Sequence, residues 1–165
     1  MKPFFYLGYW LLLAGACQSP ASSDQARQDH PSAAGPTKGQ EENYDCRHCG
    51  MPSDEFPEWQ ASLVANGQTY WFCSPRCMFL FRQNPKSGLT AVSRLEVSDY
   101  YERKKIEAQK AYFVRGGDVP GPMGPDLVPH ATRAAAEDFM KEHQGKEILT
   151  FAQITPEIIQ KLTQP

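Results

Sequence analysis

The chain has 165 residues and a formal net charge of −2 at pH 7, from 17 Lys and Arg against 19 Asp and Glu. So weak a charge gives no electrostatic case for binding nucleic acid or a polybasic attachment to membranes. The length accommodates one folded domain with flanking segments. Any specific binding or catalytic function therefore depends on particular side chains, above all on the five cysteines.

The first 17 residues are predicted to form an export signal. Lys2 precedes an apolar run at residues 4–14. That run is shorter than the about 20 residues a spanning helix needs, and it matches the apolar core of a signal peptide. Small residues then lead into Cys17, and this ending resembles a bacterial lipoprotein signal. The resemblance implies that Cys17 is lipidated and holds the protein on the periplasmic side of a bacterial membrane, with the outer membrane expected. Ordinary secretion and a cytosolic apolar N-terminus are the alternatives.

Residues 18–43 are predicted to be a disordered tether. They contain no large apolar residue and are rich in Ser, Pro, Gly, Ala and Gln. Such a segment cannot bury enough apolar area to offset the entropy of ordering it. Residues 44–165 are then expected to form the single folded domain.

The first half of this domain reads as strand, strand, helix, strand. Residues 58–65 alternate apolar and polar, and Asn66-Gly67 is a strong hairpin signal before a second strand at 68–73. A helix is predicted over 74–85, with Ser74 as its N-cap. Residues 91–97 complete the unit as a strand.

The second half repeats that order. A strand is expected at 110–116, a turn-rich segment follows, and the proline in residues 127–130 indicates an edge strand. A helix is predicted over 132–145, then a strand over 147–154 and a short closing helix over 155–163. The fold class is therefore α+β, with two ββαβ halves forming a small open-faced domain of sheets and helices. Cys73 and His130 fall at corresponding places, each shortly before the helix of its half.

Two cysteine pairs are the main candidate site. Cys46 and Cys49 are spaced C-x-x-C, and Cys73 and Cys77 are spaced C-x-x-x-C with the second in the first turn of a helix. Pairs with such spacings suit four thiolates around one tetrahedral ion, usually zinc. Cu(I) also prefers thiolates, and in an oxidising compartment the same pairs could form disulfides. The spacing leaves all three open.

Methionine and histidine add soft or borderline candidate ligands. Met51 follows the first pair, and Met123 lies in a Gly- and Pro-rich turn where a role in the core is less expected. Thioethers suit Cu(I) and not zinc. His130 is a weaker candidate, close in sequence to the Met123 turn.

An enzyme is not expected. A C-x-x-C oxidoreductase normally has its pair at the start of a helix. Here Gly, Pro and Asp follow Cys49, so no helix is predicted there.

Several segments resemble the family of the nitrous oxide reductase accessory protein NosL. They are "CGM" (49–51), "WFCSPRCMFLF" (71–81), "GPMGPDLVPH" (121–130) and "AEDFMKEHQGKEILTF" (136–151). The resemblance implies two ββαβ halves and a periplasm-facing lipoprotein. It also implies that the protein binds Cu(I) and delivers it to nitrous oxide reductase during denitrification. It suggests Cys49, Met51 and Met123 as ligands, with His130 as a less certain one.

The second cysteine pair departs from the family pattern. Many members have an acidic residue where Cys73 stands, and "FCSPRC" is similar to TRASH-type metal-binding domains. A four-cysteine site with Cys46, Cys49, Cys73 and Cys77 could therefore coexist with the copper site or replace it. The alternative function is a zinc-stabilised interaction module that transfers no copper.

Overall fold

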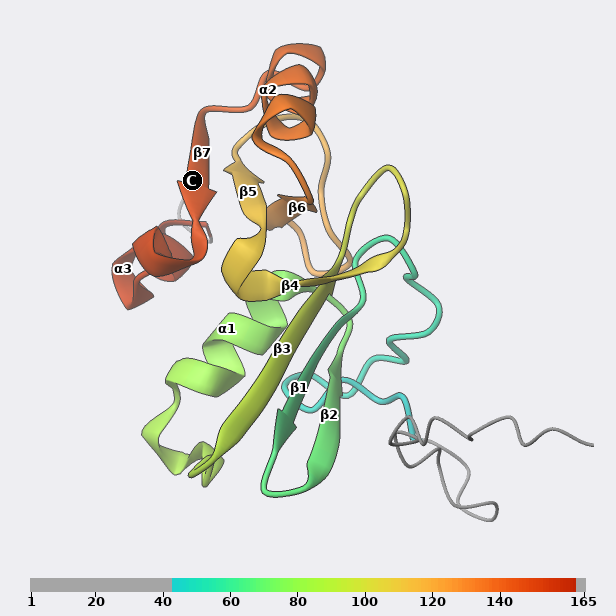
Figure 1. Cartoon of the computed structure of the whole chain (residues 1–165), viewed down its shortest axis with the longest axis vertical. Coiled ribbons are helices and arrows are strands. Elements are labelled where there is room, and N and C mark those ends of the chain that lie inside the picture. The colour runs from blue at the N-terminus through green and yellow to red at the C-terminus, as the bar shows by residue number, and fades with distance from the viewer. Residues whose placement is uncertain (1–42, 163–165) are drawn as a thin grey trace, which may run out of the picture. The chain divides into compact units, whose positions relative to one another are not determined.

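The computed structural model of the chain describes residues 43–162. The predicted signal sequence with Cys17, and the predicted tether except Asn43, lie outside the described residues. The described part contains two antiparallel sheets with helices packed on them, as the sequence predicts for an α+β protein (Figure 1).

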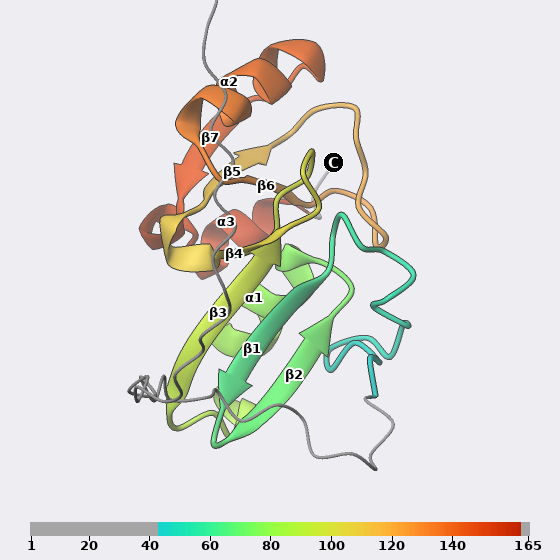
Figure 2. The same ribbon diagram turned by 45° about the vertical axis from the view of Figure 1, so that its right-hand side comes forward.

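The first half builds a four-stranded sheet in the order β2-β1-β3-β4. Its elements are β1 (Ala61–Ala65), β2 (Gln68–Phe72), α1 (Pro75–Gln83), β3 (Val92–Ser98) and β4 (Lys105–Glu107). Helix α1 lies across one face of this sheet (Figure 2). The three-residue strand β4 is an addition that the sequence did not predict.

The second half builds a three-stranded sheet in the order β6-β5-β7. Its elements are β5 (Tyr112–Arg115), β6 (Leu127–His130), α2 (Arg133–Glu142) and β7 (Glu147–Thr150), followed by α3 (Pro156–Lys161). In both halves the first strand lies between the second strand and the strand that follows the helix, and both pairings are antiparallel. The predicted ββαβ repeat is confirmed, and β6 is an edge strand as its proline indicated.

Local sequence signals set the element ends. Asn66 and Gly67 both have positive φ, 53° and 74°, as a tight two-residue hairpin requires. Ser74, Thr132 and Thr155 each accept a backbone N–H bond as the N-cap of α1, α2 and α3. The predicted strand over 147–154 ends early, because Thr150 and Gln153 form a capping box that starts a 3₁₀ turn over Phe151–Gln153. Two more 3₁₀ turns, Pro85–Ser87 and Ala108–Lys110, flank β3 and β4.

One core cluster joins the two halves. Helix α1 contacts β1 and β2 on one side and β6 and α3 on the other. Its Phe79 is fully buried, with ring centroids 5.7 Å from Phe113 and 5.5 Å from Phe151. Because Phe79 belongs to the first half and both partners to the second, the halves share a single packed interior.

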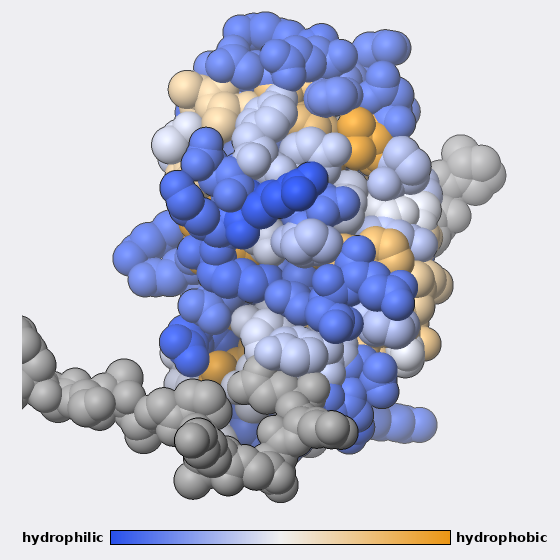
Figure 3. All heavy atoms as spheres, turned by 90° about the vertical axis from the view of Figure 1, so that its right-hand side faces the viewer, coloured by the Kyte–Doolittle hydropathy of each residue, from blue (hydrophilic) through white to orange (hydrophobic). Residues whose placement is uncertain are grey.

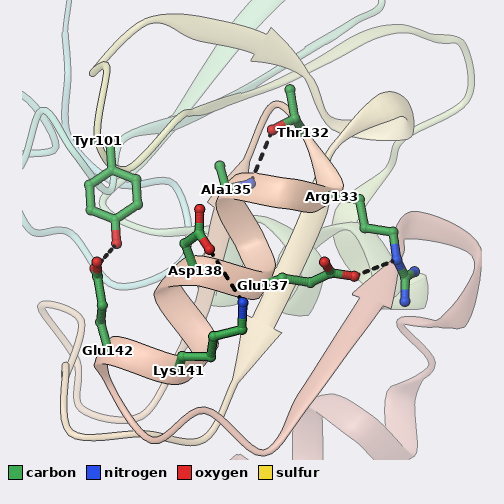
Figure 4. A network of polar contacts seen from close by, with 8 residues as sticks. All are labelled: Tyr101, Thr132, Arg133, Ala135, Glu137, Asp138, Lys141 and Glu142. Atoms are coloured by element: carbon green, nitrogen blue, oxygen red, sulfur yellow. Dashed lines mark hydrogen bonds and ion pairs between the residues drawn. The ribbon is translucent and has the colours of Figure 1, made fainter.

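A second, smaller cluster lies under α2. Val114 and Val128 on the sheet pack against Ala136 and Phe139 on the helix. The outer face of α2 carries ion pairs and hydrogen bonds, including Arg133 with Glu137 and the Tyr101 hydroxyl with Glu142 (Figure 4). α2 is therefore amphipathic and covers the second sheet.

The face of the domain seen in Figure 3 is largely polar. Figure 3 shows one face on which hydrophilic residues dominate and apolar residues occur in small groups. No helix within residues 43–162 is long and apolar enough to cross a bilayer.

Candidate metal centre

The four cysteines of the two predicted pairs converge at one place. Their Sγ atoms all lie within 4.8 Å of one another. The Cys49 Sγ lies 3.5 Å from that of Cys73 and 3.9 Å from that of Cys77, and the Cys73 and Cys77 sulfurs are 3.7 Å apart. Within residues 43–162, this is the one group of three or more Cys, His, Asp or Glu residues able to hold a metal ion together.

The first pair lies on a tight turn. The Cys46 N–H donates to the Met51 carbonyl at 2.7 Å, and the Gly50 N–H donates to the Cys46 carbonyl at 2.8 Å. Gly50 has φ +81°, a conformation that side-chain-bearing residues avoid. An Arg47 N–H bond to the Trp71 carbonyl attaches the turn to β2. These bonds fix two thiols on one side of the turn.

The second pair spans the junction between β2 and α1. Cys73 follows the last residue of β2, and Cys77 is the third residue of α1. The Ser74 hydroxyl caps the helix by accepting the Cys77 N–H at 3.4 Å. This cap turns the chain sharply enough to bring both sulfurs toward the first pair.

The sulfur spacing fits a single tetrahedral ion. Metal–sulfur bonds of 2.3 Å, typical of zinc, place the sulfurs of a tetrahedron about 3.8 Å apart. The three distances above, which join Cys49, Cys73 and Cys77, bracket this value, and the Cys46 sulfur lies within 4.8 Å of the other three. A disulfide needs about 2.05 Å between sulfurs, and all four thiols are free in the structure. The donor set therefore fits a soft or borderline metal ion.

The electrostatics of the cluster favour a cation. Hydrogen bonds from the Cys73 and Cys77 thiols lower the pKa of Cys46 well below its usual range, against the opposing effect of burial. The hydrogen bond to Cys46, together with burial, raises the pKa of Cys73, and the same two causes raise that of Cys77. The cluster thus holds one thiolate readily and resists further ionisation. A bound metal ion would relieve the repulsion that opposes it.

The four cysteines differ in exposure. Cys46, Cys73 and Cys77 are at most 3% exposed, whereas Cys49 is only partly buried. Met51 is also half-buried and packs with Cys49 against the main core cluster. Access to the cluster from solvent is therefore on the side of Cys49.

Met123 lies at the tip of a two-residue turn. Gly121 and Gly124 exchange both backbone hydrogen bonds across it, at 2.9 and 3.0 Å. Met123 is 42% exposed, which agrees with the prediction that this methionine does not serve as core filler. The turn is attached to α1, because the Arg76 guanidinium donates to the carbonyls of Met123 and Pro125 at 3.0 and 2.9 Å.

His130 is not part of the four-sulfur cluster. It is fully buried on β6, with its ring 4.9 Å from Phe139 and 5.5 Å from Tyr101 between centroids. Neither ring nitrogen has a hydrogen-bond partner. Burial lowers its pKa to about 4, so the ring is neutral at pH 7.

The sequence reasoning missed Arg76 and Asp126. The Asp126 carboxylate is buried and accepts the Arg76 N–H at 2.9 Å and the Leu127 N–H at 2.8 Å through one oxygen. Burial raises its pKa to about 6, although the nearby Ser74 hydroxyl and the N–H bonds from Leu127 and Arg76 oppose the shift. Both residues lie within the quoted segments 71–81 and 121–130, but their contact spans 50 residues and no local pattern reveals it.

Fold and site together define a small α+β domain that carries a four-thiol metal site. The chain belongs to the NosL family, whose family model matches residues 38–159. The crystal structure of the copper chaperone NosL from Shewanella denitrificans is similar to this chain at 27% identity. That match has a TM-score of 0.62 and covers 74% of this chain and 99% of that one.

A second solved structure is the solution NMR structure of the apo-NosL protein from Achromobacter cycloclastes. It matches at 24% identity and a TM-score of 0.45, over 60% of this chain and 87% of that one. No curated protein matches the chain.

Proposed function

We propose that this protein is an extracytoplasmic metallochaperone that binds one Cu(I) ion. The convergence of four sulfurs within 4.8 Å carries the proposal. Thiolates are soft ligands that suit Cu(I) as well as zinc, and the thioethers of Met51 and Met123 suit Cu(I) and not zinc. Membership of the NosL family and the similarity to a copper chaperone of known structure support the same metal.

The proposed ligands come from both halves of the chain. Cys49 and Met51 lie on one turn and supply a thiolate and a thioether at the more accessible side of the cluster. Met123 adds an exposed thioether from the second half. The remaining candidates are Cys46, Cys73, Cys77 and His130.

The acceptor we propose is nitrous oxide reductase, as expected for the family, with the chaperone held to the periplasmic side of a membrane by lipid on Cys17. The protein would act by binding and handing over an ion, not by catalysis. Nucleic acid is not among the proposed partners, given the small net charge.

The decisive experiment is an anaerobic titration of the reduced protein with Cu(I) in competition with a chromophoric chelator. One tightly bound ion is expected. Cys49→Ser and Met123→Leu should each weaken it, whereas Met140→Leu, a matched change on α2, should not. Cu(I) affinity unchanged by both Cys49→Ser and Met123→Leu would refute the ligand assignment.

A zinc-stabilised interaction module is the second candidate. The observation favouring it is that the sulfurs of Cys49, Cys73 and Cys77 are 3.5–3.9 Å apart, as in a tetrahedron of zinc–thiolate bonds, and that a fourth sulfur lies within 4.8 Å of them. Metal analysis of protein purified without added copper would separate the two candidates. One zinc per chain that persists under a Cu(I) challenge would favour the module over the chaperone.

A further inference from the structure

A group of polar contacts joins the Met123 turn to the start of helix α1, where the second thiol pair lies. Arg76 stands between Pro75 and Cys77 in the first turn of α1. Its guanidinium donates through one nitrogen to the carbonyls of Met123 and Pro125. A planar guanidinium holds two acceptors in fixed relative positions, which a flexible ammonium does not. We call the contacts of Arg76 and Asp126 the buckle.

Asp126 completes the buckle from the other side. Its carboxylate accepts the backbone N–H of Arg76, so it lies against the N-terminal turn of the nine-residue α1, where a negative charge is favoured. The other carboxylate oxygen is buried without a hydrogen-bond partner. Burying a carboxylate is costly, so the two N–H bonds to its hydrogen-bonded oxygen are needed to offset part of that cost.

Gly121 leaves room for that carboxylate. A Cβ added at Gly121 would lie 2.9 Å from the Asp126 Cβ and 3.0 Å from its unpartnered oxygen. The base of the Met123 turn therefore packs directly on Asp126. The turn, the carboxylate and the first turn of α1 form one continuous unit, although their residues are some 50 positions apart.

We propose that Arg76 and Asp126 are positioning residues, which hold the Met123 thioether within reach of the thiols at the start of α1. This inference rests on the proposed Cu(I) function. A metal ligand on an exposed turn loses affinity when the turn can move, because ordering it then costs entropy at each binding event. The buckle removes that cost by fixing the backbone of the turn beforehand.

The test compares Cu(I) affinities of single and double variants by anaerobic chelator competition. Arg76→Leu removes the guanidinium without adding a metal ligand, and Arg82→Leu on the last turn of α1 is the matched control. Loss of a supporting residue around a metal site typically costs 10–100-fold in affinity, so we expect about tenfold for Arg76→Leu. Arg82→Leu should match the wild type.

The double variant separates positioning from general damage. If Arg76 acts through Met123, Arg76→Leu should cost no further affinity in a Met123→Leu background. Gly121→Ala disturbs the same contacts from the base of the Met123 turn and should lower the affinity to a similar extent. Equal losses from Arg76→Leu in both backgrounds, or wild-type affinity in both Arg76→Leu and Gly121→Ala, would overturn the proposal.

Amide hydrogen exchange tests the anchoring without copper. The Gly124 and Leu127 N–H groups should exchange at least tenfold faster in Arg76→Leu than in the wild type or Arg82→Leu. Unchanged exchange would show that the buckle does not hold the turn. A wild-type chain that takes up no Cu(I) would overturn the proposed function, and the exchange result would still decide whether the turn is anchored by Arg76.

Discussion

Replacing Cys77 by serine should remove most of the stabilisation that a bound metal ion gives to the fold. Cys77 is 1% exposed, and its sulfur lies 3.7 Å from that of Cys73 and 3.9 Å from that of Cys49. The hydroxyl that replaces it is a poor ligand for a soft ion. The variant keeps three thiols and the helix cap, so the fold is expected to survive while the site loses a quarter of its donors.

The size of the effect follows from linkage. An ion that binds only the folded state, at a free concentration 1,000 times its dissociation constant, adds about 4.1 kcal/mol to the free energy of unfolding. For a folded part of about 120 residues, the unfolding entropy is about 0.25 kcal/mol per kelvin, so Tm should rise by about 16 °C.

Losing one thiolate should weaken binding by on the order of 100-fold, more than most supporting residues cost. At the same free zinc, the variant then gains only about 1.4 kcal/mol, or about 6 °C.

The assay is calorimetric unfolding under anaerobic conditions, with and without zinc buffered at that free concentration. Burying the serine hydroxyl should cost about 1 kcal/mol without metal, so only the zinc-dependent increment is diagnostic. Met78→Leu alters the adjacent buried residue, keeps all four thiols and should show the full increment. If Cys77→Ser also shows the full increment, the metal lies elsewhere and the four-thiol assignment is wrong.

Three further predictions follow from the same structure. The folded-state pKa of His130 is about 4, against 6.5 for the free side chain, because burial disfavours the charged ring. The free energy of unfolding should therefore be highest above pH 6.5 and fall by about 3 kcal/mol as the pH drops toward 4. Denaturant midpoints across that range should show this loss, and His130→Phe should remove it. Gly50→Ala should lower the free energy of unfolding by about 1 kcal/mol and weaken zinc binding. The cause is the backbone φ of +81°, since no atom lies within 4 Å of the added Cβ. A dissociation constant equal to that of wild type would contradict this. Phe79→Ala should lower the free energy of unfolding by about 3–5 kcal/mol and leave a single unfolding transition, since this ring of the first half packs against rings of the second. Two separate transitions would show that the halves do not share a core.

Local chemistry was enough to predict most of the fold. The Asn66-Gly67 pair needs positive φ at both positions, and only a tight hairpin between two strands supplies that geometry. The N-caps of the three helices could also be predicted, because each depends on a side chain within its own short segment. Strand β4 was not, because Lys105–Glu107 is too short to display a period and pairs only because β3 lies beside it. The predicted strand over 147–154 was too long, since the Thr150–Gln153 capping box ends it early.

The candidate site was likewise predictable from the sequence only in its local features. Ligand spacing predicted two thiol pairs, and the turn at Gly50 and the cap at Ser74 are local features that place each pair. Spacing could not predict the buckle, which depends on how the two halves pack. It also could not tell which way His130 faces. Every residue of β6 is buried, so the strand lacks the alternation that would assign its side chains to a face.

The unequal burial of the four sulfurs has a kinetic consequence. Three of them are sealed in the interior, and Cys49 alone is partly open to solvent. An incoming ligand on an acceptor could reach a bound ion first past Cys49, so ligand exchange would begin at that sulfur. Affinity would then be set largely by the buried thiols, while the residence time of the ion would be set at the exposed one. A tightly held ion could in this way still leave quickly, provided that the acceptor presents its own soft ligand at that side.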